Sequence, residues 1–349
     1  MKSERSELLF INFKIDSKDP VLGFAPRIVE EFSKEFYSIT VLTGFFSGEK
    51  ITGNVKITST NWVPGQNLRN VLKFYYYLIK ILINDKPILC YTHQAAPQAV
   101  LAVPFLKLFK MKQILWYASV SNSWAIKLAT KVVNRLVTST DLSKPFESHK
   151  YFVIGQAIQT KEMSKKNSFT KKQTLNFVNV GRLDPSKGLE NIIDCLKAQT
   201  HVGTFTFNHF GATTQNSGEY KKHLQSIYSD EIMSGQLKFN GGIEYSQLVN
   251  TYAKFDVFIH SFDGSLDKVL IEALAGGIPV VTTNRAFKEI FGSWATNINA
   301  TLNEEIGSFL AMNEKEINEK LVKQTNLLAL QHSLNTFPQR VRQQFNALG

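Results

Sequence analysis

The 349-residue sequence has little of the material that several protein classes need. It holds two cysteines, Cys90 and Cys195, and both stand in apolar strand-like or helix-like settings. We therefore expect buried free thiols rather than disulfides or a redox pair. The apolar stretches YYYLIKILIN and AVLAVPFLKLF are broken by lysine or proline and are too short to cross a bilayer. No apolar run of signal-peptide length precedes the first strand-like segment, so the sequence predicts a cytoplasmic protein.

Several chemical signatures are missing as well. No G-x-G-x-x-G follows the first strand, which argues against a nicotinamide enzyme. There is no D-x-D between strand ends and no His/Cys/Asp cluster with ligand spacing, so we expect neither a metal site nor another cofactor. Helix-turn-helix, zinc-knuckle and aromatic RNP-like patterns are absent, so binding of nucleic acid would depend on charge alone and is not expected.

Positive charge is in excess, and it is distributed unevenly along the chain. The net charge is +11, and residues 1–155 hold 20 basic against 11 acidic side chains. This basic first half of the chain could bind phosphorylated substrates or an anionic membrane face, or it could be a solvated basic surface. The segment LRNVLKFYYYLIKIL, with Lys73 and Lys80 among aromatic residues, could lie on a membrane or be a core helix.

Short β-branched runs alternate with helix-like segments throughout, which predicts an α/β protein with two parallel, Rossmann-like sheets. The polar stretch 160–174 reads as a linker or the surface beside it. We expect an N-terminal domain over residues 1–158, a C-terminal domain over 159–335, and a final helix over 336–349 that packs back toward the first domain. A central cleft between the domains would face the carboxyl ends of both sheets. The strands are expected at residues 8–13, 38–43, 87–92, 113–117, 175–180, 204–210, 255–260 and 278–283, with shorter ones in NVKITST, RLVTS, YFVI and QLKFNG.

The stretch VGRLDPSKG places Arg182 and Lys187 in a loop between a strand end and a helix start, with Gly181 allowing close approach of the backbone. Two cations at such a position suit a diphosphate, because arginine can bind oxygens in pairs and lysine adds a compact charge. The alternative is that Arg182 pairs with Asp184 and Lys187 is simply solvated.

The stretch GSLDKVLIEALAGGIPVV predicts a helix from about Leu266 followed by a buried strand. Lys268 stands in the first helical turn, where the helix dipole disfavours a cation by roughly 0.3–1 kcal/mol. This cost is explained if an anion lies at the helix start. Glu272, one turn further on, could accept hydrogen bonds from sugar hydroxyls.

Together these two stretches resemble the donor site of the retaining nucleotide-sugar glycosyltransferases of family 4, in a divergent form with GSLDKV. The stretches DPVLGFAPRIVEEFSKEF, LWYASVSNSWAIKLATKVVNRLVTSTDLSKPF and VIGQAIQTKEM also resemble segments of that family, so the likeness covers nearly the whole chain. The resemblance implies the two-domain GT-B fold. It also implies transfer of a sugar, hexosyltransferase-like and metal-independent, from a nucleotide diphosphate sugar to a glycan or lipid-linked acceptor. Synthesis of bacterial surface polysaccharide or glycolipid, at the inner face of the plasma membrane, is the expected setting by analogy.

The resemblance also implies roles for single residues. Arg182 and Lys187 would bind the donor diphosphate and stabilise charge on the leaving nucleotide, and Glu272 would bind the ribose. The amides of Val269 and Leu270 would meet the phosphates, with Gly23 and Phe24 in the loop beneath them, and Gly241, Gly242 and Ile243 would border the base. The remaining donor-binding residues would be Gly181, Asp267 and Lys268.

Two positions depart from the family pattern. Gly264 stands where the family has the first glutamate of its E-x7-E pattern, and Asp263 or Asp267 could partly replace it. Ser119 stands where a histidine is usual beside the reacting sugar, and His93 could contact acceptor or sugar or be an ordinary strand-end residue. The alternative function is therefore a catalytically degenerate nucleotide-binding scaffold or regulatory subunit with the same fold.

Overall fold

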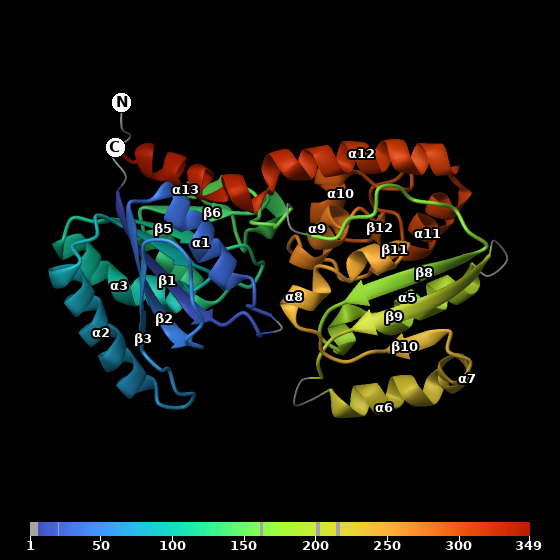
Figure 1. Cartoon of the computed structure of the whole chain (residues 1–349), viewed down its shortest axis with the longest axis horizontal. Helices are drawn as coiled ribbons and strands as arrows, with labels where there is room; N and C mark the ends of the chain where they lie inside the picture. Colours follow the sequence, from blue (N-terminus) through green and yellow to red (C-terminus); the bar gives the residue numbers. More distant parts are fainter. Residues whose placement is uncertain (1–5, 20, 161–162, 200–202, 214–216) are drawn as a thin grey trace. The chain divides into compact units, whose positions relative to one another are not determined.

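The computed structural model describes residues 6–19, 21–160, 163–199, 203–213 and 217–349 (Figure 1). It divides into two compact units, the first made of residues 1–157 and 334–349 and the second of residues 158–333. The end of the chain thus belongs to the first unit. The expected boundaries at residues 158 and 335 differ from this division by one or two residues.

Unit 1 is built on a parallel sheet of seven strands in the order β3-β2-β1-β4-β5-β6-β7. The strands are β1 (Glu7–Ile15), β2 (Ser38–Phe46), β3 (Val55–Ser59), β4 (Leu89–His93), β5 (Lys112–Trp116), β6 (Arg135–Thr138) and β7 (Tyr151–Val153). The helices are α1 (Ala25–Glu35), α2 (Asn67–Asn84), α3 (Ala96–Leu108), α4 (Trp124–Val132) and α13 (Phe337–Asn346), with short 3-10 turns η1 (Asp141–Ser143) and η4 (Leu334–Thr336).

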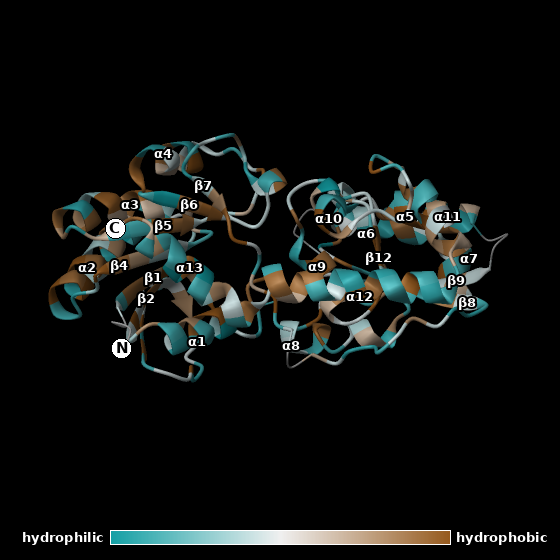
Figure 2. Cartoon of the chain, turned by 90° about the horizontal axis from the view of Figure 1, so that it is seen from above, coloured by the Kyte–Doolittle hydropathy of each residue, from teal (hydrophilic) through white to brown (hydrophobic). Residues whose placement is uncertain are grey.

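Helices cover both faces of this sheet, as the uninterrupted burial of residues 8–12 along β1 requires. Leu8 and Phe10 pack into a core with α1 and α13, whereas Leu9 and Ile11 pack into another core with α2 and α3. Figure 2 shows the apolar strands between these helix layers. Helix α13 is held on α1 by an ion pair between Arg342 and Glu35 (3.2 Å) and by apolar contacts.

Unit 2 is built on a parallel sheet of five strands in the order β10-β9-β8-β11-β12. The strands are β8 (Thr174–Val180), β9 (Thr204–Phe210), β10 (Leu237–Phe239), β11 (Val257–His260) and β12 (Val280–Thr282). The helices are α5 (Leu189–Ala198), α6 (Gly218–Ile227), α7 (Ser229–Met233), α8 (Tyr245–Leu248), α9 (Lys268–Ala275), α10 (Arg285–Phe291), α11 (Leu302–Ala311) and α12 (Glu314–Gln331), with 3-10 turns η2 (Pro185–Lys187) and η3 (Tyr252–Lys254).

The lysine-rich stretch expected as a linker packs on unit 2 over its described part. Phe169 is fully buried against Phe309, with ring centroids 5.5 Å apart. Lys166 lies 2.6 Å from Asp256. Residues 163–173 are therefore part of the surface of unit 2, while residues 161 and 162 of the expected linker lie outside the described residues.

The strand order fixes where a ligand can bind in each unit. In such sheets the crevice lies outside the carboxyl ends of the strands, at the point where the order reverses. That point falls between β1 and β4 in unit 1 and between β8 and β11 in unit 2. Both motifs singled out in the second half of the sequence follow β8 or β11, so the fold brings them to one edge of the same sheet.

Cys90 is buried, and burial raises the pKa of its thiol to about 12, whereas Cys195 is only partly buried. None of the helices in the described part of the chain combines the length and apolar character that crossing a bilayer requires. Within the same ranges, no three His, Cys, Asp or Glu side chains are grouped so that they could hold a metal ion.

Candidate functional site

The loops that follow β8 (residues 181–188, the β8 loop) and β11 (residues 261–267, the β11 loop) lie against each other. The Ser261 hydroxyl donates to the carbonyl oxygens of Lys187 (2.9 Å) and Gly188 (3.1 Å). Gly188 has a φ of +61°, and a Cβ at this position would lie 2.5 Å from Ser261 Oγ. Glycine is therefore required here both by the backbone and by the close approach of the two loops.

Lys187 is the centre of this contact. Its side chain passes over Gly181, where a Cβ would lie 3.7 Å from the lysine carbons. Its ammonium is 2.9 Å from Asp267 Oδ2 and 4.2 Å from the centre of the Phe262 ring. The alternative of a simply solvated Lys187 is therefore wrong, because a carboxylate and an aromatic face fix the position of this cation.

Asp267 accepts a second hydrogen bond, from buried His260, whose Nε2 is 3.1 Å from Oδ2. Burial alone would raise the pKa of Asp267, but the hydrogen bonds and charges of His260 and Lys187 outweigh it and hold the pKa well below its usual range. Asp267 is thus an ionised carboxylate that offsets the charge of Lys187.

Helix α9 begins directly after this carboxylate. Asp267 is its N-cap residue, but its side chain makes no capping hydrogen bond, because it faces Lys187 and His260 instead. The N–H of Leu270 donates to the Asp267 carbonyl (3.2 Å), so one of the two amides expected to meet a phosphate is already engaged. The rest of the first turn, with Val269, has no side-chain cap and favours an anion.

Lys268 points along the helix rather than toward its start. Its ammonium lies 3.4 Å from Glu272 Oε1 and 4.8 Å from the centre of the Tyr245 ring. Glu272 is only 2% exposed, and the Tyr252 hydroxyl is 3.5 Å from its other oxygen. The unfavourable cation in the first turn therefore compensates a buried carboxylate, and its contact with a phosphate stays a prediction.

Gly264, the position where a glutamate was expected, has no room for a side chain as the loop stands. A Cβ there would lie 2.6 Å from the ring of Phe262, the same ring that covers Lys187. The other proposed replacement, Asp263, is engaged elsewhere, since its carboxylate accepts from the backbone N–H and Nε of Arg285. Of the two carboxylates considered as substitutes, Asp267 alone contacts Lys187.

The loop with Gly241 to Ile243 reaches the same edge of the sheet. The Gly211 N–H donates to the Gly241 carbonyl (2.8 Å), and the Gly181 N–H donates to the Phe210 carbonyl (3.0 Å). A Cβ at Gly211 would overlap the Gly181 carbonyl, so the backbones after β8 and β9 are in direct contact. Gly242 lies beside Ala212, and Arg182 is exposed on the β8 loop next to this group.

Behind these loops, Asn179 ties three strands together. Its Nδ2 donates to the Ile259 carbonyl (2.7 Å), which leaves its Oδ1 to accept from Nδ1 of His209 (2.9 Å). His209 is completely buried, and burial lowers its pKa to about 4. The histidine is therefore neutral, with its proton on Nδ1.

The site residues expected in the first half gather at the switch point of unit 1. Gly23 closes a turn onto Asp19, and the ring of Phe24 lies 6.1 Å from that of His93. His93 ends β4, stacks on Trp116 (ring centroids 4.5 Å apart) and shares a 2.9 Å hydrogen bond with the Tyr91 hydroxyl. His93 is thus a buried residue at the end of its strand, held among aromatic rings, and its contact with a sugar stays a prediction.

Ser119 follows β5 at the same edge of unit 1. Its hydroxyl accepts from the N–H of Ser121 (3.1 Å) and shapes the turn that precedes α4. The geometry of neither unit tests whether these residues take part in the site carried by unit 2. Such a role stays a prediction for Ser119, His93, Gly23 and Phe24.

The sequence analysis missed several residues that contact the expected site residues, among them His260, which ends β11 and contacts Asp267. Ser261 and Phe262 belong to the β11 loop, and Tyr245 and Tyr252 contact Lys268 and Glu272. A serine directly after a strand opposite a helix-starting glycine was the available signal for Ser261. The tyrosines carried no signal, because aromatic residues at helical spacing usually belong to the core.

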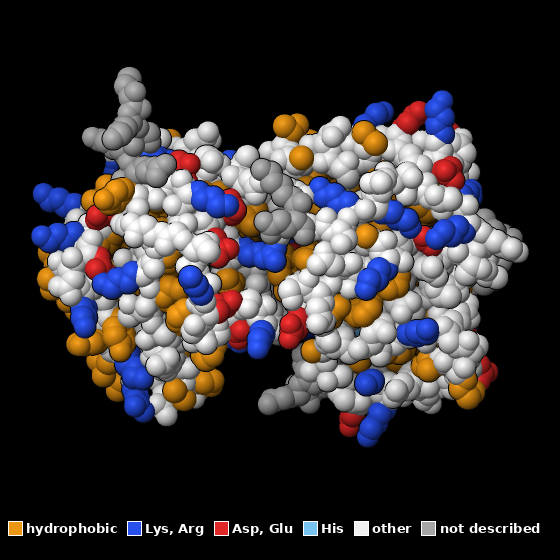
Figure 3. Space-filling model, viewed as in Figure 1, with side chains coloured by type: hydrophobic (Ala, Val, Ile, Leu, Met, Phe, Trp, Pro, Cys, Tyr) orange, Lys and Arg blue, Asp and Glu red, His pale blue; other side chains and the backbone are white. Residues whose placement is uncertain are grey.

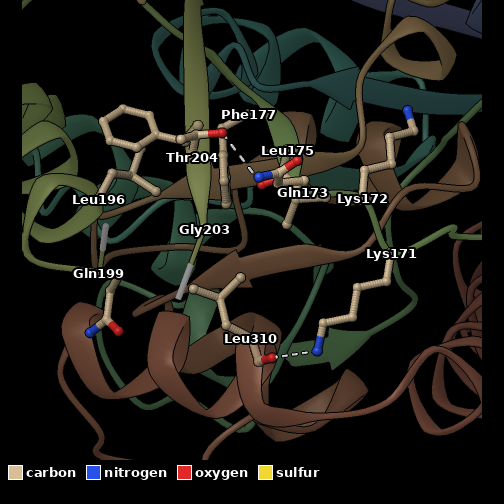
Figure 4. A pocket seen from close by; sticks show the side chains of 11 residues that line it. Lys171, Lys172, Gln173, Leu175, Phe177, Leu196, Gln199, Gly203, Thr204 and Leu310 are labelled. Carbon is tan, nitrogen blue, oxygen red and sulfur yellow. Dashed lines mark hydrogen bonds between the residues drawn. The ribbon is translucent and has the colours of Figure 1, made fainter. Parts of the chain in front are cut away.

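A recess at the opposite edge of the same sheet is shown in Figure 4. It is lined by Lys171, Lys172 and residues at the amino ends of β8 and β9, and its volume is about 40 Å³. The Lys171 ammonium donates to the Leu310 carbonyl (2.7 Å). Sites for small ligands usually measure roughly 300–1,000 Å³, so this recess is too small for a nucleotide.

Comparison with known families finds one match, which lies in the second unit. Residues 159–324 match the family model described as "Glycosyl transferases group 1". The match includes the β8 loop, the β11 loop and α9. No curated protein sequence matches the chain significantly.

Solved structures with a similar fold cover almost the whole chain. HepE from Anabaena, in complex with UDP and glucose, matches 98% of this chain and 100% of its own, with a TM-score of 0.74 and 14% identity. A glycosyltransferase from Rickettsia africae matches 98% of each chain at a TM-score of 0.72 and 13% identity. The lipopolysaccharide outer core galactosyltransferase WaaB matches 98% of this chain and 99% of its own at 0.68 and 12%. The chain thus has the fold of GT-B glycosyltransferases, which confirms the predicted fold class.

Proposed function

We propose that the chain is a glycosyltransferase that moves a sugar from a nucleotide diphosphate sugar to a glycan or lipid-linked acceptor, with retention at the anomeric carbon. The observation that carries this proposal is the placement of Lys187 at the switch point of unit 2. Its ammonium lies between Asp267 and Phe262, beside the uncapped start of α9. The match of residues 159–324 to a glycosyl transferase family supports the reaction class.

Breaking the bond to the sugar leaves negative charge on the departing diphosphate. We propose that Lys187, held by Asp267 and Phe262, and the first turn of α9 offset that charge, and that exposed Arg182 approaches it from the β8 loop. A single such donor can be worth about 10²–10³ in rate. We propose that these groups offset the charge without a metal ion, so turnover is expected to persist in a chelator. Glu272, held by Lys268 and Tyr252, would accept from the ribose hydroxyls.

The base and the sugar are proposed from the relatives. HepE was crystallised with UDP-glucose, so we propose a uridine diphosphate sugar as the first donor to test. The name of WaaB refers to lipopolysaccharide, which supports the proposed role in bacterial surface polysaccharide or glycolipid synthesis at the inner face of the plasma membrane.

The experiment is a turnover assay that follows release of UDP from uridine diphosphate sugars, with the anomeric configuration of the product read by NMR. Lys187→Ala and Arg182→Ala should each lower turnover about 10²–10³-fold. Lys323→Ala, an exposed cation on α12, is the matched control and should leave turnover unchanged. Binding of UDP without turnover of any donor would favour the alternative of a degenerate scaffold, and absence of both would refute the proposal.

A further inference from the structure

Helix α2 has two apolar faces, and only one of them is used by the core of unit 1. Phe74, Leu78, Ile81 and Leu82 are buried against the sheet and α3. On the outer side, four large apolar side chains are between 55% and 75% exposed. They are Leu68, Leu72, Tyr76 and Ile83.

The spacing of these four residues makes them a continuous stripe. At 100° per residue, positions 68, 72, 76 and 83 fall within roughly 80° of one another on the outer side of the helix. Helix α3 packs on α2 through the Tyr75–Phe105 ring contact (5.2 Å). That helix ends in Leu108 and Phe109, which are also exposed. We name the six exposed residues 68, 72, 76, 83, 108 and 109 the α2 stripe.

Cations border the α2 stripe, and acids are missing from it. Arg69, Lys73 and Lys80 follow on the next sector of the same helix, and residues 67–84 contain no aspartate or glutamate. Asp85, directly after the helix, is paired with Lys56 at 2.6 Å. Figure 3 shows hydrophobic side chains interspersed with Lys and Arg over the edge that α2 forms, at the lower left.

We propose that the α2 stripe docks unit 1 on an anionic lipid surface. An interfacial helix places apolar side chains into the boundary between headgroups and acyl chains and keeps Lys and Arg beside them at the level of the headgroups. The stripe and its flanking cations have this arrangement. A second copy of the chain is the poorer occupant, because a symmetric contact through α2 would bring like charges together. The proposal rests on this surface alone and not on the proposed function.

The test uses the full chain and co-sedimentation with phosphatidylcholine vesicles that contain or lack phosphatidylglycerol. We expect partition onto the anionic vesicles that weakens as salt is added. Each cation near such a surface contributes about fivefold to the partition coefficient. Replacing Arg69, Lys73 and Lys80 together by glutamine should therefore lower it about a hundredfold. The matched control, with the same change of charge on exposed residues of unit 2, is Lys222→Gln with Lys315→Gln and Lys323→Gln.

A second variant separates insertion from plain charge attraction. Leu72→Gln with Tyr76→Gln keeps the net charge and changes only exposed side chains, so the fold should be retained. It should lower partition at least tenfold, since each apolar side chain removed from water contributes about tenfold or more. A polarity-sensitive label on Leu72→Cys should shift to the blue on anionic vesicles, and the same label on Leu330→Cys, an exposed position on α12, should not.

Three results would overturn the proposal. They are absence of binding to anionic vesicles at low salt, equal loss of binding in the control variant, and an unshifted label at position 72. A chain that sediments as a dimer and becomes monomeric in Leu72→Gln with Tyr76→Gln would assign the stripe to a second copy instead. None of these readouts depends on turnover, so they are distinct from a failure of the proposed glycosyltransferase activity.

Discussion

The carboxylate of Asp267 is the most informative group to change. It forms an ion pair with the Lys187 ammonium, to which a diphosphate is proposed to bind. Its Oδ2 lies 2.9 Å from the Lys187 ammonium and 3.1 Å from His260 Nε2. Asp267→Asn keeps the shape of the side chain and removes one negative charge. We predict that this variant binds UDP more tightly than the wild type.

The magnitude follows from the distances. A phosphate that contacts the same ammonium would lie about 5 Å from the carboxylate, and two unit charges at that distance repel by about 3 kcal/mol at an effective dielectric constant of 20. The carboxylate is 27% exposed, and Lys187 and His260 lose a charge-assisted hydrogen bond to it, so we expect about half of this value. A gain of about 1.5 kcal/mol is about a tenfold lower Kd.

The assay is calorimetric titration with UDP and, separately, with a uridine diphosphate sugar. Because the pKa of Asp267 is held below its usual range, the carboxylate is charged throughout the neutral range, and the effect should be the same at pH 6 and pH 8. Asp263→Asn is the control, since this neighbouring carboxylate pairs with Arg285 instead. Weaker binding of UDP by Asp267→Asn would refute the reasoning. If binding of UDP is unchanged and binding of the sugar donor is weaker, Asp267 contacts the sugar instead of the diphosphate.

Three further predictions concern the packing around the site. Lys268→Met should lower the free energy of unfolding by about 3 kcal/mol, because it leaves buried Glu272 uncompensated. A double variant with Glu272→Gln should regain more than half of this loss in chemical denaturation, and no regain would contradict the pairing. The pKa of buried His209 is about 4, against 6.5 in the unfolded chain. The unfolded chain therefore binds the proton first, and the free energy of unfolding should fall by about 3 kcal/mol as the pH falls from 6.5 to 4. Denaturation curves of His209→Gln should lack this part of the pH dependence. Phe262→Leu should weaken UDP binding about fivefold through loss of its cation–π contact with Lys187, and Gly264→Glu should do the same by displacing that ring. If a double variant binds UDP much more weakly than either single variant in calorimetry, the two effects are independent and this explanation is wrong.

The sequence was sufficient for the fold because central strands such as β1 and β11 are buried on both faces and appear as short apolar runs. Each strand that we expected is present, with ends that differ by a few residues, and α9 begins at Lys268 rather than near Leu266. The order of the strands placed both motifs at one edge of a sheet, since each follows a strand at the switch point.

The contacts within the site could not be read in the same way. Lys268 was expected at a phosphate, but a lysine side chain can extend in several directions, and here it lies over Glu272. Gly264 was interpreted as a lost glutamate, whereas its space is filled by Phe262, two residues earlier. Such pairings depend on the rotamers of neighbouring loops, which residue spacing does not determine.

The central claim is that a donor nucleotide binds at the carboxyl ends of β8 and β11. Photocrosslinking with a uridine diphosphate sugar that carries an azide on the base, followed by mass spectrometry of the labelled peptides, tests this location directly. The account predicts labelling in the peptide around Gly241–Ile243 that excess UDP suppresses and that Lys187→Ala abolishes. Labelling that UDP does not suppress, or that falls on the opposite edge of the sheet near Lys171, would contradict it.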